Sequence, residues 1–224
     1  MQGKDAQEAM ERILILGAGP QARVIPDVIA LCPCQELIGF VDEAGERPFL
    51  KECADRFPVY DLREYPDELK SGVGDFFVLI ATRFPELRAE LLARTQAAGL
   101  SLANIVHPSV LIAGSARLGR GLLLMPYAII GSGADIGDTV IVNSASTIDH
   151  DCILEQGVVL APGVHLAGGV RVGSGTAIGV GACVSPGVAI GRNSLIGAGS
   201  VVTKDIPDGV VAAGVPARVL RSVR

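Results

Sequence analysis

A six-residue period in the C-terminal half of the chain constrains its fold more than any other feature. From Ile112 to Val202, every sixth residue is Ile, Leu or Val, with no break in the frame. Glycine often follows directly, as at Gly119, Gly131 and Gly173. One buried aliphatic residue per six-residue repeat is typical of a β-solenoid, and small residues permit its tight corners.

Three repeats make one triangular coil, so positions 18 residues apart lie on neighbouring coils. The sixteen repeats therefore predict about five coils stacked about 4.8 Å apart. In this frame Gly168 lies next to His150, where its backbone N–H can bind an oxygen that becomes negative. Alternatively, Gly168 and Gly169 only permit a tight turn of the backbone. The sequence does not decide between the binding role and the structural role.

Residues 12–106 alternate instead between strand and helix patterns, which predicts a parallel sheet with helices on its faces. Pro26 indicates a late start or a kink in the first helix. The predicted strands are 12–17, 36–42, 58–61, 75–82 and 102–106, and the predicted helices are 21–32 and 85–99.

Charge and composition exclude several classes of function. A net charge of −5, from 19 basic and 24 acidic residues without a basic run, argues against a nucleic-acid partner. The apolar runs are far shorter than the roughly 18 residues that span a bilayer, so we expect no membrane insertion. The N-terminal segment has no apolar signal region, and five irregularly spaced cysteines are typical of reduced thiols. We therefore expect a cytoplasmic protein.

The repeat over residues 108–204 resembles that of the hexapeptide-repeat acyltransferases, whose solenoid is a left-handed parallel β-helix. The segment 209–220 is similar to the G-x-P-A-[KR] element that follows the solenoid in those enzymes. Together with a Rossmann-like first domain, the HPS at 107–109 and the DHD at 149–151, nearly the whole chain resembles the sugar acetyltransferases of the PglD/NeuD type. These enzymes acetylate amino sugars, often nucleotide-linked, for bacterial glycans.

The expected fold is an α/β N-terminal Rossmann-like domain followed by an all-β left-handed parallel β-helix. The expected divisions are a disordered leader at 1–11, a sugar-nucleotide-binding domain at 12–106, an acyltransferase solenoid at 107–207 and a tail with a cofactor-contacting element at 208–224. The resemblance also implies a homotrimer that binds acetyl-CoA along the solenoid between subunits.

His150 stands between Asp149 and Asp151 in a tract otherwise poor in titratable residues. A neutral imidazole can remove a proton from an acceptor that attacks a thioester, if a carboxylate fixes its tautomer. Neighbouring side chains in a coil point in different directions, so we expect one carboxylate to reach the ring. The residues alone leave open which one, and the resemblance implies Asp151. A solvated polar corner is the alternative.

The resemblance implies further contacts around this histidine. Asn143 matches a substrate-facing asparagine, although an asparagine ladder inside the coil competes with that role. Val159 replaces a second histidine that many relatives carry, which favours an amine acceptor over a hydroxyl. The residues expected to bind acetyl-CoA are Gly168, Gly173, Gly181, Gly214, Pro216 and Arg218.

The segment GAGPQA at 17–22 follows a strand and should open a helix, where backbone N–H groups could hold a phosphate. The full G-x-G-x-x-G is absent, so a mononucleotide diphosphate fits better than a dinucleotide. The turn at 83–85 departs from the family pattern, as does Gln21, and both departures leave the nucleotide and sugar open. The residues expected to bind the nucleotide-linked amino sugar here are Gly17, Gly19, Gln21, Asp42 and Arg83.

The leading hypothesis is therefore acetyl-CoA-dependent N-acetylation of a nucleotide-linked amino sugar. O-acetylation of a sugar, as in the sialic-acid type, is the close alternative, and a non-catalytic scaffold that binds sugar nucleotide is another. A zinc solenoid would need three histidines at metal spacing, but the chain has only three and His107 precedes the solenoid, so we expect no metal. The incomplete glycine pattern argues against a NAD-dependent oxidoreductase.

Overall fold

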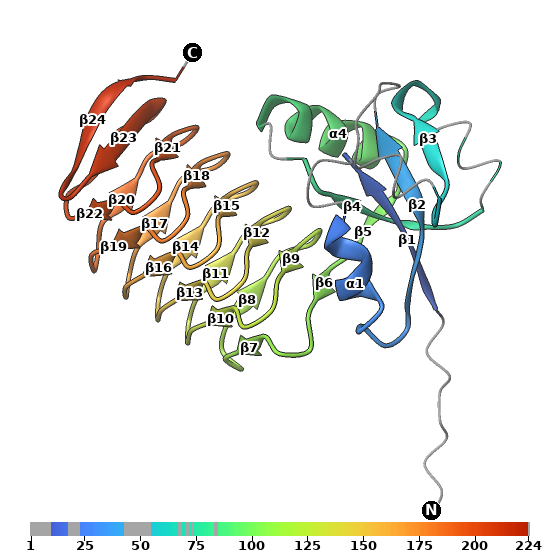
Figure 1. Ribbon diagram of the computed structural model, residues 1–224, viewed down its shortest axis with the longest axis horizontal. Helices are drawn as coiled ribbons and strands as arrows, with labels where there is room; N and C mark the ends of the chain where they lie inside the picture. Colours follow the sequence, from blue (N-terminus) through green and yellow to red (C-terminus); the bar gives the residue numbers. More distant parts are fainter. Residues whose placement is uncertain are drawn as a thin grey trace, which may run out of the picture.

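The computed structural model describes residues 10–17, 23–42, 55–66, 69, 72, 74–82 and 85–223. It consists of an α/β unit followed by a β-solenoid (Figure 1). Residues 1–9 of the expected leader lie outside the described residues, and the first strand begins at Glu11. None of the described helices has the length and apolar character needed to cross a membrane.

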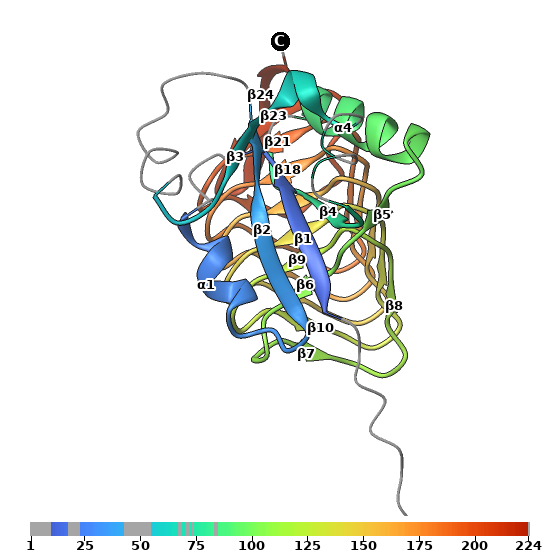
Figure 2. The ribbon, with the colours of Figure 1, turned by 90° about the vertical axis from the view of Figure 1, so that its right-hand side faces the viewer.

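A five-stranded parallel sheet with the strand order β3-β2-β1-β4-β5 is the centre of the α/β unit (Figure 2). The strands are β1 (Glu11–Leu16), β2 (Gln35–Asp42), β3 (Val59–Asp61), β4 (Phe77–Ile80) and β5 (Ser101–Leu102). The described helices are α1 (Ile25–Ile29), the 3₁₀ helix η2 (Leu62–Glu64) and α4 (Pro85–Ala97). The parallel sheet predicted from the alternation is confirmed.

The period of two in β1 sends its side chains into two separate cores. Ile13 and Ile15 pack with α1 and with residues of the solenoid, whereas Leu14 and Leu16 pack in the core that contains residues of α4. Pro26 lies in the first turn of α1, so the helix begins late, as its position predicted.

Three parallel sheets form the faces of the solenoid. Face 1 contains β7 (Leu111–Ile112), β10 (Ile129–Ile130), β13 (Thr147–Ile148), β16 (His165–Leu166), β19 (Cys183–Val184) and β22 (Val201–Val202). Face 2 contains β8 (Arg117–Leu118), β11 (Asp135–Ile136), β14 (Ile153–Leu154), β17 (Arg171–Val172) and β20 (Ala189–Ile190). Face 3 contains β6 (Ile105–Val106), β9 (Leu123–Leu124), β12 (Ile141–Val142), β15 (Val159–Leu160), β18 (Ala177–Ile178), β21 (Leu195–Ile196), β23 (Val210–Gly214) and β24 (Ala217–Ser222), the last pair being an antiparallel hairpin.

Residues 18 apart pair across neighbouring coils, as the period predicted. Ile130 pairs with Ile148, and Ile148 pairs with Leu166. These three inward-facing side chains are at most 1% exposed and belong to one continuous core. The sheets together form a solenoid of the left-handed type.

The turns between the strands form three edges, which fix where each polar side chain lies. The 1–2 edge, between faces 1 and 2, contains 131–134, 149–152 and 167–170. The 2–3 edge contains 137–140, 155–158, 173–176 and 191–194. The 3–1 edge contains 125–128, 143–146, 161–164 and 179–182.

The α/β unit and the solenoid are joined almost without a linker. The strand predicted over 102–106 divides into β5, which extends the first sheet, and β6, which belongs to face 3. Ala103 N donates to Val78 O at 2.9 Å, and Ile105 N donates to Leu122 O at 2.8 Å. Between them, the side chain of Asn104 donates to Gly119 O and accepts from Leu122 N, both at 3.0 Å.

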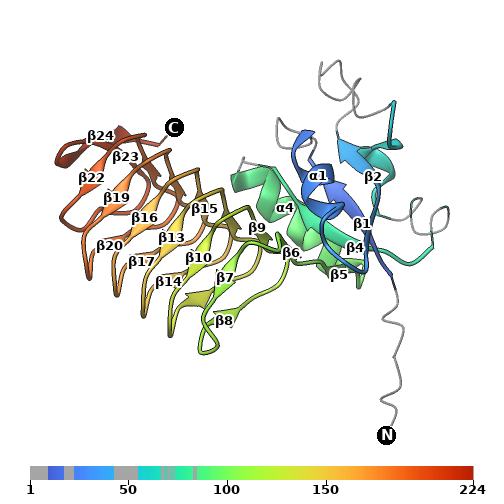
Figure 3. The same ribbon diagram turned by 60° about the horizontal axis from the view of Figure 1, so that its bottom comes forward.

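The α/β unit covers the first coils of face 3 (Figure 3). Leu123 and Ile141 of this face share a core with Ile13 and Ile15 of β1. The 1–2 edge lies opposite face 3 in the triangular coil, so the α/β unit and the 1–2 edge are on different sides of the solenoid.

Candidate active site

His150 lies in the turn of the 1–2 edge between β13 and β14, and the two flanking aspartates hold it in different ways. Asp149 Oδ1 accepts a hydrogen bond from the His150 backbone N at 2.7 Å. Asp151 has a positive φ of 58°, a conformation that turns its side chain back beside the ring. Its Oδ2 lies 2.9 Å from His150 Nδ1. Asp151 is therefore the carboxylate that contacts the imidazole, while Asp149 fixes the backbone.

This arrangement favours the protonated imidazole and fixes the role of each ring nitrogen. The hydrogen bond with Asp151, followed by the charge of Asp149, raises the pKa of His150 above its ordinary value. With Nδ1 donating to the carboxylate, the neutral ring has its lone pair on Nε2. The side chain of His150 is 63% exposed, so this nitrogen is available to a ligand.

Two glycines on neighbouring coils make room for the pair. A Cβ on Gly168 would overlap the imidazole of His150 at Nε2. A Cβ on Gly133 would come within 2.6 Å of Asp151 Oδ1. Gly133 was not among the predicted site residues, although the 18-residue frame places it directly beneath Asp151.

The backbone beside the imidazole also offers a hydrogen-bond donor. Gly169 N donates to His150 O at 2.8 Å and so joins the two coils. Gly168 N makes no hydrogen bond to any group in the part of the chain that the structure describes. Gly168 therefore combines the absence of a side chain beside Nε2 with an N–H that makes no hydrogen bond in the described part of the chain.

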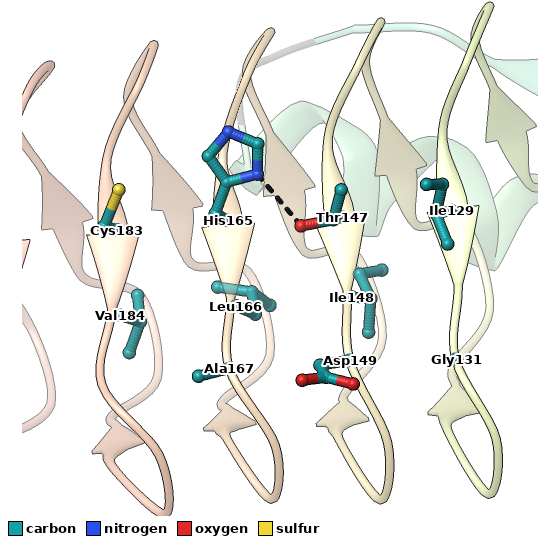
Figure 4. A pocket seen from close by; sticks show the side chains of 10 residues that line it. All are labelled: Ile129, Gly131, Thr147, Ile148, Asp149, His165, Leu166, Ala167, Cys183 and Val184. Carbon is teal, nitrogen blue, oxygen red and sulfur yellow. Dashed lines mark hydrogen bonds between the residues drawn. The ribbon is translucent and has the colours of Figure 1, made fainter.

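A shallow hollow of about 480 Å³ on face 1 borders this edge (Figure 4). Asp149 and Ala167 lie at its edge near His150, and Cys183 lies on the far strand. Within it, Thr147 Oγ1 lies 2.9 Å from His165 Nδ1. The hollow is open to solvent and mostly apolar in its lining, which suits an extended chain more than a compact ligand.

The predicted acetyl-CoA residues lie on three different edges. Gly168 is on the 1–2 edge, Gly173 on the 2–3 edge and Gly181 on the 3–1 edge. Gly214, Pro216 and Arg218 lie in or beside the β23–β24 hairpin at the end of face 3, where Ala213 pairs with Arg218. Within a single chain these residues therefore lie on three different edges and at the end of face 3.

Asn143 is on the 3–1 edge, and its Nδ2 donates to Leu160 O at 2.7 Å. This contact is of the ladder kind that competes with a substrate-facing role. Val159, where the resemblance implies a second histidine in many relatives, is on face 3 and packs against the core shared with the α/β unit. Neither residue is brought next to His150 within one chain, because each belongs to a different side of the coil.

The predicted nucleotide-binding residues that the structure describes meet at one edge of the parallel sheet. Gly17 follows β1 with a φ of 89°, and its N donates to Val41 O at 2.8 Å. Asp42 ends the neighbouring β2 and is 4% exposed. A Cβ on Gly17 would come within 3.0 Å of Thr82 Cβ. Three strand ends therefore converge where β2 and β4 flank β1. Gly19, Gln21 and Arg83 lie outside the described residues.

The remaining histidines take part in local contacts. His107 Nδ1 lies 2.7 Å from Ser109 Oγ at the start of the solenoid, and His165 is on face 1. Among the described residues there is no group of three His, Cys, Asp or Glu side chains that could hold a metal ion.

No family model matches the chain, but several solved structures are similar to nearly all of it. A His-to-Asn variant of perosamine N-acetyltransferase from Caulobacter crescentus, in complex with CoA and GDP-perosamine, is 35% identical with a TM-score of 0.85; the match covers 95% of this chain and 98% of that one. The acetyltransferase domain of PglB from Neisseria gonorrhoeae FA1090, in complex with acetyl coenzyme A, is 31% identical with a TM-score of 0.82, over 94% and 99% of the two chains.

A third structure, WeeI from Acinetobacter baumannii AYE, is 25% identical with a TM-score of 0.77, and the match covers 94% of this chain and 100% of that one. These matches include both the α/β unit and the solenoid. Three observations point to the same family: the six-residue repeat, the histidine on its 1–2 edge and the identity over the whole length. The chain belongs to the hexapeptide-repeat sugar N-acetyltransferases of the PglD/NeuD type.

Proposed function

We propose that the protein transfers the acetyl group of acetyl-CoA to the amino group of a nucleotide-linked amino sugar in bacterial glycan biosynthesis. The observation that carries this proposal is the contact between Asp151 and His150 Nδ1, which leaves the lone pair on Nε2, the ring atom nearest to the Cβ position of Gly168. The ligands of the similar structures, GDP-perosamine with CoA and acetyl coenzyme A, support the class of both substrates.

In this mechanism the neutral His150 removes a proton from the attacking amine. The amine nitrogen forms a bond with the thioester carbonyl carbon, and Nε2 accepts the proton that the nitrogen loses. The N–H of Gly168 donates to the carbonyl oxygen as it becomes negative. The C–S bond then breaks, the proton passes from the imidazolium to the CoA sulfur, and the amide leaves as product. Asp151 stabilises the imidazolium throughout.

We also propose that residues 12–106 bind the nucleotide as a Rossmann-like domain, with 107–207 as the acyltransferase solenoid and 208–224 as the cofactor-contacting tail. The convergence of the strand ends at Gly17, Asp42 and Thr82, the proposed nucleotide crevice, supports this, because ligands of parallel sheets bind where neighbouring strands connect in opposite directions. A phosphate would lie against Gly17, and Asp42 would accept from a ribose or base.

We propose a homotrimer in which each active site is shared between subunits. The α/β unit covers face 3, and His150 is on the opposite edge of the same coil, so an acceptor held by one protomer would meet the histidine of another. The positions of Gly168 and Gly181 on different edges support a similar arrangement for acetyl-CoA, which would contact two protomers at once.

The test is thiol release from acetyl-CoA with a panel of nucleotide-linked amino sugars and their hydroxyl counterparts. We expect release with at least one amine and a product whose mass increases by one acetyl group. Release with the hydroxyl counterparts alone would replace this proposal with O-acetylation. Binding of a sugar nucleotide without any turnover across the panel would instead favour a non-catalytic scaffold.

Mixed trimers test the shared site. A variant that lacks His150 is mixed with a variant that carries Asp42→Ala, after reversible dissociation of both. If each site uses one residue from each of two protomers, the mixture regains activity that neither parent has. A mixture as inactive as its parents would show that both residues act within one chain.

A further inference from the structure

Arg88 is a buried cation at the joint between the α/β unit and the solenoid. It lies in the first half of α4, and it is only 3% exposed. No carboxylate is paired with it among the described residues. Burial lowers the pKa of Arg88 to about 10, which still leaves the guanidinium charged near neutral pH. A charge in this position requires strong hydrogen-bond acceptors.

The guanidinium donates hydrogen bonds to two different parts of the molecule. Nη1 donates to Thr139 O at 2.6 Å, on the 2–3 edge of the solenoid. Nη2 donates to Thr82 O, two residues after the end of β4 in the α/β unit. One planar group therefore joins two backbone carbonyls that are 57 positions apart in the sequence. Charge-assisted bonds of this kind are shorter and stronger than neutral ones.

The acceptor in the α/β unit belongs to the crevice assigned to the nucleotide. Thr82 is 5% exposed, and Gly17 approaches it so closely that a Cβ on Gly17 would come within 3.0 Å of the Thr82 Cβ. A shift of the Thr82 backbone would therefore shift the strand end at Gly17. Arg88 reaches these strand ends through its hydrogen bond to Thr82 O, so its effect on a ligand would pass through Thr82.

The acceptor in the solenoid is also held firmly. Thr139 is 0% exposed, and its N donates to Arg120 O at 2.7 Å on the neighbouring coil. The stem of Arg88 passes over Gly157, where a Cβ would come within 3.4 Å of Arg88 Cδ. Both ends of the contact are therefore attached to rigid backbone.

Resting on the proposed function, we propose that Arg88 is a positioning residue that sets the nucleotide crevice of the α/β unit at a fixed place relative to the solenoid. Apolar contacts between β1, α1 and face 3 hold the two parts together but are not directional. The two hydrogen bonds of Arg88 add direction, because the guanidinium fork fixes both carbonyls at once. Arg88 thereby determines where the amine of a bound acceptor lies relative to the catalytic histidine in the trimer.

The experiment compares Arg88→Met with Arg94→Met in the full-length protein. Arg94 is on the same helix and also donates to backbone carbonyls, to Leu62 O at 2.9 Å and to Tyr65 O, but both lie within the α/β unit. The acetylation rate is measured with the nucleotide-linked acceptor, with the free amino sugar that lacks the nucleotide, and with varied acetyl-CoA.

For Arg88→Met we expect kcat/KM for the nucleotide-linked acceptor to fall about 10- to 100-fold, as a misplaced substrate would cause. The KM for acetyl-CoA and the slow rate with the free amino sugar should stay within about twofold, since neither uses the crevice. Arg94→Met should leave all three values near those of the wild type. An equal loss with both acceptors, or the same selective loss in Arg94→Met, would overturn the proposal.

A second measurement does not depend on activity. Amide hydrogen exchange of Arg88→Met should become faster both near Thr82 and near Thr139, without global unfolding. Faster exchange confined to α4 would contradict a role across the joint. If Arg88→Met does not fold, Arg88→Lys serves instead, because one ammonium group cannot match the fork and should give the same pattern more weakly. A wild-type protein inactive with every acceptor would refute the proposed function. The exchange result would still show whether Arg88 stabilises the contact between the α/β unit and the solenoid.

Discussion

Two edges of the same coils have opposite characters. At the 1–2 edge, the side chains of His150 and Asp151 are 63% and 74% exposed. At the 2–3 edge, Thr139 is fully buried beneath α4 and accepts from the buried Arg88. Both edges are built from the same kind of turn between two-residue strands. The repeat itself therefore does not determine function. The function of an edge depends on the side chains in its turns and on whether another element packs over them.

The comparison predicts that changes on the 1–2 edge alter the chemistry with little effect on stability. His150→Ala should lower kcat about 100- to 10,000-fold, because the loss of a positioned general base typically costs that much and a carboxylate is a weaker base than an imidazole near neutral pH. Its free energy of unfolding should change by about 0.5 kcal/mol or less, since the side chain is exposed. Thiol release and thermal unfolding measure the two effects. A variant that kept half of the wild-type kcat would remove His150 from the mechanism.

Gly168→Ala should act on the same imidazole from the neighbouring coil. The added methyl group would overlap Nε2, so the ring must move, and a displacement of about 1 Å can lower the rate about 100-fold. Gly114→Ala is the matched control, because Gly114 lies on the same edge three coils earlier with no atom within 4 Å of its Cβ position. Equal rates for the two variants would contradict the close packing of His150 and Gly168.

Asp151→Asn should change both the rate and its pH dependence. A general base acts when neutral, so activity falls below its pKa, and the carboxylate of Asp151 raises that pKa. Removing the charge should therefore move the acidic limb of kcat/KM to lower pH and reduce the plateau by at least about 10-fold. Asp149→Asn should shift the limb less, because Asp149 contributes a weaker effect than the hydrogen bond of Asp151. A larger shift for Asp149→Asn would reverse the roles of the two aspartates.

The smallest effect is expected on face 2, which separates the two edges. Arg117 Nη2 lies 2.8 Å from Asp135 Oδ2, with side chains 72% and 42% exposed. Exposed ion pairs contribute about 0.2–1 kcal/mol, and salt weakens them. Arg117→Ala should lower the free energy of unfolding by about that amount and leave kcat unchanged. If chemical denaturation instead showed that Arg117→Ala lowers the free energy of unfolding by several kcal/mol, the ion pair would contribute much more to stability than an exposed pair normally does.

The solenoid could be predicted from sequence because each coil repeats one local pattern. The same frame predicted that Gly168 lies beside His150 and could have found Gly133 beneath Asp151. The residues alone did not decide between Asp149 and Asp151, since the decision depends on the positive φ at Asp151.

The α/β unit was predicted less completely because its contacts are not periodic. Its strands followed from their apolar runs, but the division of 102–106 between two sheets depends on which neighbours each half meets. Arg88 gave no signal in the sequence. Its partners are backbone carbonyls, which every residue has, and only the packing of α4 against the 2–3 edge brings them within reach.

The single residue between the two sheets has a consequence for selectivity. Ala103 is bonded to β4 and Ile105 to the next coil, so Asn104 alone separates these two bonded residues, and the joint has little chain to absorb a hinge motion beyond what Arg88 restrains. A joint of this kind keeps the distance between the α/β unit and the solenoid nearly constant. Under the proposed function, an enzyme with this joint would select among sugars by the span from the diphosphate to the reacting nitrogen, and an amine at another ring carbon would not reach the thioester.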